Sequence, residues 1–104
     1  MSVLMEFAMF PTSKEGSSSS PYVSRIIKMI RESGYSYQLT PMGTIVETEN
    51  IQQALALVEK SYAQLEPDCD RVYSTVKFDI RKGRVNGMQQ KIESIEKRIG
   101  SIEK

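Results

Sequence analysis

The 104-residue sequence contains no histidine and a single cysteine, Cys69. Without histidine, the chain lacks the usual general base near neutral pH and the commonest transition-metal ligand. One cysteine cannot form a disulfide within the chain, nor the thiolate cluster of a zinc site. We therefore expect a protein that is not an enzyme of the histidine- or metal-dependent kind and needs no metal or cofactor. We interpret Cys69 as a small loop residue near a turn.

The sequence also lacks long apolar runs and a concentrated charge of one sign. No stretch approaches the roughly 20 apolar residues that span a bilayer. Residues 1–10 are apolar but contain Glu6 and lead into Pro11, which predicts a strand and no secretory signal. The formal net charge is +1, whereas nucleic acids and anionic membranes bind concentrated basic surfaces. We expect a cytoplasmic protein with no nucleic acid or membrane partner.

Side-chain alternation predicts the strands. Residues 2–10 are apolar on both faces, which is typical of a central strand covered on both sides. Residues 35–40 and 44–47 are strand-like on either side of residues 41–43, Pro-Met-Gly, so they form one bent strand or a hairpin of two short strands. Residues 71–81 form a further strand, with most of its apolar side chains on one face.

Capping signals predict two helices between these strands. Ser20-Pro21 supplies an N-cap and a proline in the first turn for a helix over residues 21–33. Asn50 caps a second helix, which ends before Pro67. The side chains that we expect on its buried face are Ile51, Ala54, Leu55, Val58, Tyr62 and Leu65.

A last helix is predicted after Gly83, with apolar residues at heptad spacing. This seam is narrower than the apolar face of a helix that covers its own sheet. It favours a partner helix, which another subunit could supply, over a position along the edge of its own domain. The residues of the seam are Val85, Met88, Ile92, Ile95, Ile99 and Ile102.

The predicted order of elements is βαββαβα. It indicates an α+β fold of the ferredoxin-like type, a βαββαβ sandwich with helices on one face of an antiparallel sheet and an extra C-terminal helix. We expect residues 1–104 to form a single domain. The other face of the sheet carries Leu4, Ala8 and Phe10. Covering that face with further copies predicts a homodimer or a homotetramer.

Polar residues inside the predicted strands are the candidates for function. The carboxylates of Glu6, Glu47 and Asp79 could bind a hard cation or perform acid–base chemistry if they converged. Pairing with Lys77 and Arg81 is the simpler interpretation. Polar strand residues in a closed pocket would favour a small-molecule ligand, whereas exposure to water would favour a regulatory or interaction module. The function of such a module is its oligomeric assembly, tuned by an anion or small metabolite.

Two segments together resemble a known family. Residues 40–44 read Thr-Pro-Met-Gly-Thr, and residues 71–81 form a strand with Arg, Lys, Asp and Arg among its polar positions. With the first strand and the serine-capped helix, they resemble the small thiamine-binding (YkoF-like) family over nearly the whole chain. The resemblance implies a ferredoxin-like fold, dimers assembled through their sheets and often tetramers. It also implies non-catalytic binding of thiamine or its hydroxymethylpyrimidine precursor.

The resemblance further implies where a ligand binds. The hydroxyl groups of Ser20 and Thr44 would hydrogen-bond an aminopyrimidine, a flat ring with donors and acceptors. Glu6 or Glu47 would accept a hydrogen bond from its exocyclic amine and would suit the charge of a thiazolium ring. The full set of expected ligand-binding residues is Ser20, Met42, Gly43, Thr44, Glu47 and Glu6.

Overall fold

The structure is a computed structural model that describes residues 2–12, 20–83 and 87–100. Its elements are β1 (Ser2–Pro11), α1 (Ser20–Ser33), β2 (Ser36–Thr40), β3 (Gly43–Thr48), α2 (Ile51–Leu65), β4 (Val72–Arg81) and α3 (Gly87–Ile99). The strands form one antiparallel sheet in the order β2-β3-β1-β4. This confirms the ferredoxin-like α+β fold. Of the two arrangements predicted for residues 35–47, the structure has the hairpin, formed by β2 and β3.

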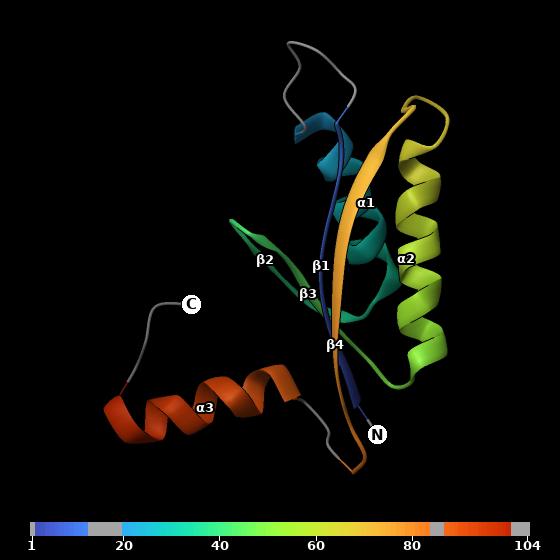
Figure 1. Ribbon diagram of the computed structural model, residues 1–104. Helices are drawn as coiled ribbons and strands as arrows, with labels where there is room; N and C mark the ends of the chain where they lie inside the picture. Colours follow the sequence, from blue (N-terminus) through green and yellow to red (C-terminus); the bar gives the residue numbers. More distant parts are fainter. Residues whose placement is uncertain (1, 13–19, 84–86, 101–104) are drawn as a thin grey trace.

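The two faces of the sheet are covered by different helices. Helices α1 and α2 cover one face, whereas α3 lies apart from them and projects from the other side of the sheet (Figure 1). Strand β1 is central and pairs with β3 and β4. Because alternate side chains of a strand point to opposite faces, every second residue of β1 enters the core with α1 and α2. These residues are Val3, Met5, Phe7 and Met9.

Helix α2 is capped as the sequence predicts. The Asn50 side chain accepts a hydrogen bond from the backbone N–H of Gln53 at 2.9 Å. The Gln53 side chain accepts one from the backbone N–H of Glu49 at 2.8 Å. The two side chains thus satisfy donors at the start of the helix, which otherwise lack partners. The helix ends at Leu65, two residues before Pro67.

The buried face of α2 differs from the prediction. Leu55 and Tyr62 are 52% and 44% exposed, whereas Leu57 and Ser61 are almost fully buried. The Ser61 hydroxyl donates to the carbonyl oxygen of Leu57 at 2.7 Å, so a serine enters the core with its polar atom satisfied. Placing Leu55 and Tyr62 on the buried face was therefore wrong. The buried residues of this helix are Ala54, Leu57, Ser61 and Leu65.

The apolar seam of helix α3 is partly buried near the start of the helix and exposed near its end. Met88 and Ile92 are partly buried and line a cavity with residues of the sheet face opposite α1 and α2. Ile95 and Ile99 are 48% and 71% exposed. The other two seam residues, at positions 85 and 102, lie outside the described residues. Met88 and Ile92 of the seam therefore pack within their own chain. Among the described helices, none has the length and apolar character needed to cross a membrane.

Candidate functional site

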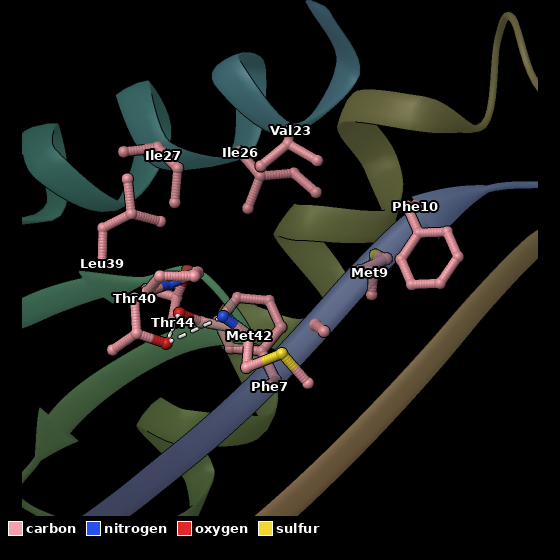
Figure 2. Close-up of a pocket in the computed structure, with 13 residues that line it drawn as sticks. Phe7, Met9, Phe10, Val23, Ile26, Ile27, Leu39, Thr40, Met42 and Thr44 are labelled. Carbon is pink, nitrogen blue, oxygen red and sulfur yellow. Dashed lines mark hydrogen bonds between the residues drawn. The ribbon is translucent and has the colours of Figure 1, made fainter. Parts of the chain in front are cut away.

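A pocket of about 230 Å³ lies at the turn of the β2–β3 hairpin, between β1 and α1 (Figure 2). The hairpin contributes residues 39–44, and β1 contributes residues 7–10. Helix α1 crosses above them and closes the pocket with three apolar side chains. These are Val23, Ile26 and Ile27. The pocket is therefore built from three elements that are separate in the sequence.

The pocket exposes an edge of β1. The pairing of β1 with β3 ends at Phe7 and Thr44, whereas its pairing with β4 continues to Pro11. Residues 8–10 therefore have no partner strand on the pocket side within the described part of the sheet. An unpaired strand edge offers backbone N–H and C=O groups for hydrogen bonds. A planar ring with donors and acceptors at its rim can bond to such an edge.

The hairpin turn is held by Thr40 and fits closely against β1. The Thr40 hydroxyl donates to the carbonyl oxygen of Gly43 at 2.8 Å and accepts from the backbone N–H of Met42 at 3.2 Å (Figure 2). A Cβ atom at Gly43 would lie 2.9 Å from the carbonyl oxygen of Phe7. Only glycine allows this approach without a shift of the backbone. The turn thereby fixes Thr44 at the pocket wall.

Thr44 brings a polar group into a mostly apolar pocket. Thr44 is 5% exposed, and its hydroxyl makes no hydrogen bond to any described residue. In the described part of the chain, every fully buried side-chain polar atom has a partner, so the Thr44 hydroxyl reaches the pocket surface. Small-molecule sites combine apolar walls with a few placed polar groups. Thr44 and the β1 edge supply those groups here.

The structure brings together three of the six residues expected to bind a ligand. Met42, Gly43 and Thr44 line the pocket. Ser20 is the first residue of α1 and lies in a groove that adjoins the pocket. Glu6 and Glu47 lie on the opposite face of the sheet, and neither lines the pocket. A ligand in this pocket therefore does not reach the two carboxylates.

Two carboxylates on that opposite face form ion pairs. Glu6 lies 3.3 Å from the ammonium of Lys77 on the neighbouring strand β4. Asp79 pairs with Lys91 of α3. The simpler interpretation is thus confirmed for Glu6 with Lys77. No cluster of three metal-ligating side chains occurs in the described residues.

Glu47 has a different partner, which is the start of α3. Its carboxylate accepts hydrogen bonds from the backbone N–H of Gly87 at 2.6 Å and of Met88 at 3.4 Å, and from the Ser2 hydroxyl at 2.7 Å. The first N–H groups of a helix lack partners within the helix and carry partial positive charge. Glu47 therefore anchors α3 on the sheet. The pattern within the strand contains no signal for this role.

Sequence patterns also missed the apolar wall of the pocket. Val23 and Ile27 lie in the helix predicted over residues 21–33, and Leu39 lies in the strand-like residues 35–40. Leu39 is 58% exposed, and all three line the pocket. Their shared role depends on the way α1 crosses the hairpin, which no local pattern predicts.

Comparison with known proteins identifies the family. Residues 5–96 match the family described as thiamine-binding protein. The chain belongs to this family. A UPF0045 protein of Methanothermobacter thermautotrophicus is 29% identical over 98 residues, which cover 93% of this chain and 99% of the relative. The UPF0045 protein YqgV of Bacillus subtilis is 28% identical over 101 residues, with coverage of 92% and 96%.

Solved structures share the fold of this thiamine-binding family member. A hypothetical protein of Methanocaldococcus jannaschii has a TM-score of 0.79 at 28% identity, covering 90% of this chain and 95% of its own. A Thermotoga maritima protein with a proposed role in thiamine biosynthesis or salvage has a TM-score of 0.78 at 21% identity, covering 91% and 99%. At 21% identity, the similarity to the Thermotoga protein shows a shared fold only. The resemblance inferred from residues 40–44 and 71–81 is confirmed at the level of the family.

Proposed function

We propose that this protein binds thiamine or a thiamine-related pyrimidine such as hydroxymethylpyrimidine, without catalysing a reaction. The observation that carries the proposal is the Thr44 hydroxyl beside the open edge of β1, in an otherwise mostly apolar pocket. Membership of the thiamine-binding family supports a thiamine-related role. So does the thiamine-related role proposed for the Thermotoga protein of the same fold.

The pocket suits an aminopyrimidine ring. Such a ring is flat and carries hydrogen-bond donors and acceptors at its rim, which match the backbone groups of residues 8–10 and the hydroxyl of Thr44. Phe7 and Met42 supply apolar contacts for its faces. The volume of about 230 Å³ lies below the range of about 300–1,000 Å³ usual for drug-sized ligands. One ring therefore fills the pocket, and the rest of a larger ligand extends outside it.

The side chains around the pocket support binding over turnover. The sequence has no histidine, and the pocket is lined by neither aspartate nor glutamate within residues 2–12, 20–83 and 87–100. General acid–base catalysis needs a titratable group within hydrogen-bond reach of the reacting atoms. The lining offers hydroxyl, thioether, aromatic and aliphatic side chains, which hold a ligand without transferring a proton.

We also propose that the protein functions as a homodimer or homotetramer. Phe10 and Tyr73 lie next to each other on the sheet face opposite α1 and α2, and both are at least 36% exposed. Ile95 and Ile99 add exposed apolar surface on α3. Exposed apolar side chains of this kind are typical of interfaces between subunits.

Isothermal titration with thiamine and with hydroxymethylpyrimidine tests the binding proposal. We expect saturable binding of at least one compound by the wild-type protein. Thr44→Val keeps the shape of the side chain and removes the hydroxyl, so it should weaken binding about 3- to 10-fold, the value of one neutral hydrogen bond. Thr75→Val is the control, because Thr75 is exposed on β4 and does not line the pocket.

The alternative function is an interaction module whose assembly is the function, tuned by an anion or small metabolite. The exposed apolar residues of α3 are the observation that favours it. Folded, oligomeric wild-type protein that produces no heat with either compound would favour this alternative. Equal affinity of the wild type and Thr44→Val for the ligand would instead indicate that the ligand does not bind in this pocket.

A further inference from the structure

A groove of about 650 Å³ continues from the pocket along α1. Pocket and groove share Val23, Ile27 and Leu39, so the two cavities adjoin along these side chains. Figure 2 shows Leu39 beside Ile27, on the far side of the pocket from Phe10. The charged residues that line the groove are Lys28 and Arg31 of α1. An apolar, ring-sized pocket thus lies next to a groove with two cations.

Lys28 and Arg31 differ from Arg25, Lys77 and Lys91, which pair with carboxylates in the described part of the chain. Arg25, on the same helix, pairs with Asp68, and this hydrogen bond raises the pKa of the Arg25 guanidinium. Lys28 and Arg31 form no ion pair or hydrogen bond with any described residue. Among the described residues that line the groove, none carries a carboxylate. Since residues three apart on a helix are neighbours on its surface, both side chains are available to the same small anion.

We infer that the groove binds the phosphate group of a phosphate ester whose ring occupies the pocket. The inference rests on the proposed function and names the form of the ligand. Arginine presents several N–H donors in a planar fork, and lysine presents a compact positive charge, and both are common phosphate ligands. The substituent of the ring passes Leu39 and places its phosphate between Lys28 and Arg31.

Charge also distinguishes the ester from the free alcohol. Thiamine carries a cationic thiazolium ring, and the described residues that line the pocket and the groove include no carboxylate to balance this charge. Lys28 and Arg31 repel a ligand with a net positive charge. Phosphorylation supplies the missing negative charge within the ligand itself. Hydroxymethylpyrimidine is neutral, and its phosphate gains the same two contacts.

The test compares esters with alcohols. Wild-type protein is titrated with hydroxymethylpyrimidine, its monophosphate, thiamine and thiamine monophosphate, each at low and high salt. We expect an ester to bind at least 10-fold more tightly than its alcohol at low salt, which corresponds to about 1.4 kcal/mol. The difference should shrink at high salt, because ions screen contacts between exposed charges. The pair of compounds that binds identifies the ring.

A double variant assigns the effect to the groove. Lys28→Gln with Arg31→Gln should remove the preference for the ester and leave the affinity for neutral hydroxymethylpyrimidine unchanged. Lys60→Gln is the matched control, since Lys60 is an exposed cation of α2 away from the pocket and groove. It should retain the full preference.

The outcomes separate the two proposals. Equal affinity for ester and alcohol, or a preference that persists in the double variant, overturns the phosphate assignment and leaves the pocket as the ring site. Absence of binding by all four compounds overturns the proposed function together with the inference. Loss of the preference in the double variant alone, with Thr44→Val weakening both alcohol and ester, establishes pocket and groove as one site.

Discussion

The carboxylate of Glu47 accepts a hydrogen bond from the backbone N–H of Gly87 at 2.6 Å, although the two residues are 40 positions apart in the sequence. Glu47 lies in β3, and Gly87 begins α3. A carboxylate at the first turn of a helix satisfies donors that the helix cannot satisfy itself and complements the helix dipole. This bond therefore joins α3 to the sheet.

Removing this carboxylate should weaken the attachment of α3. We expect Glu47→Ala to lower the free energy of unfolding by about 2 kcal/mol, the typical value of hydrogen bonds to a charged group. Urea unfolding followed by circular dichroism measures the change. Glu59→Ala is the control, because Glu59 is exposed on α2, and it should change stability by less than about 0.5 kcal/mol. Equal stability of the two variants would contradict an anchoring role for Glu47.

Two leucines of α2 should differ sharply in their contribution to stability. Leu57 is 1% exposed, whereas Leu55, two positions earlier, is 52% exposed. We expect Leu57→Ala to lower the free energy of unfolding by about 3 kcal/mol, because it leaves a cavity in the core. Leu55→Ala should lower it by less than about 1 kcal/mol, since exposed sites contribute little. Thermal or urea unfolding of both variants decides between the observed and the predicted face of α2.

Substitution of Gly43 should damage the pocket. A Cβ at this position would lie 2.9 Å from the backbone oxygen of Phe7, so in Gly43→Ala either the turn or β1 must shift. We expect ligand affinity to fall at least as far as in Thr44→Val, and stability to fall by about 1–3 kcal/mol. Gly83→Ala is a useful comparison, because nothing lies within 4 Å of a Cβ there. It should lose some stability through its left-handed backbone and retain ligand affinity.

The exposed isoleucines of α3 should contribute to self-association. Ile95 and Ile99 lie four residues apart, on one face of the helix, and both are exposed. We expect light scattering to give a mass above that of one 11.8 kDa chain for the wild type and a lower mass for Ile95→Ser with Ile99→Ser. The control is Gln90→Ser with Lys97→Ser, two exposed polar residues of the same helix.

An unchanged mass in the isoleucine variant would exclude α3 from the interface. The sheet face with Phe10 and Tyr73 would then be the surface to test. If the wild type itself has the mass of one chain, the proposal of a homo-oligomer fails.

Local patterns in the sequence determined the elements and their order. The apolar strand over residues 2–10, the Asn50 cap and the Pro41–Gly43 turn each depend on neighbouring residues, and each appears in the structure. Met42, Gly43 and Thr44 were expected to contact a ligand, and they line one pocket because they are consecutive in this turn. A tight turn places consecutive side chains close together wherever it occurs.

Tertiary structure alone decided how these elements meet. The face of α2 that is buried depends on its packing against the sheet and α1, and this packing selected Leu57 and Ser61 over Leu55 and Tyr62. The crossing of α1 over the hairpin brought the groove with Lys28 to the pocket. Such contacts join residues far apart in the chain. Their geometry follows from the packing of whole elements, which the periodicity within any one element does not specify.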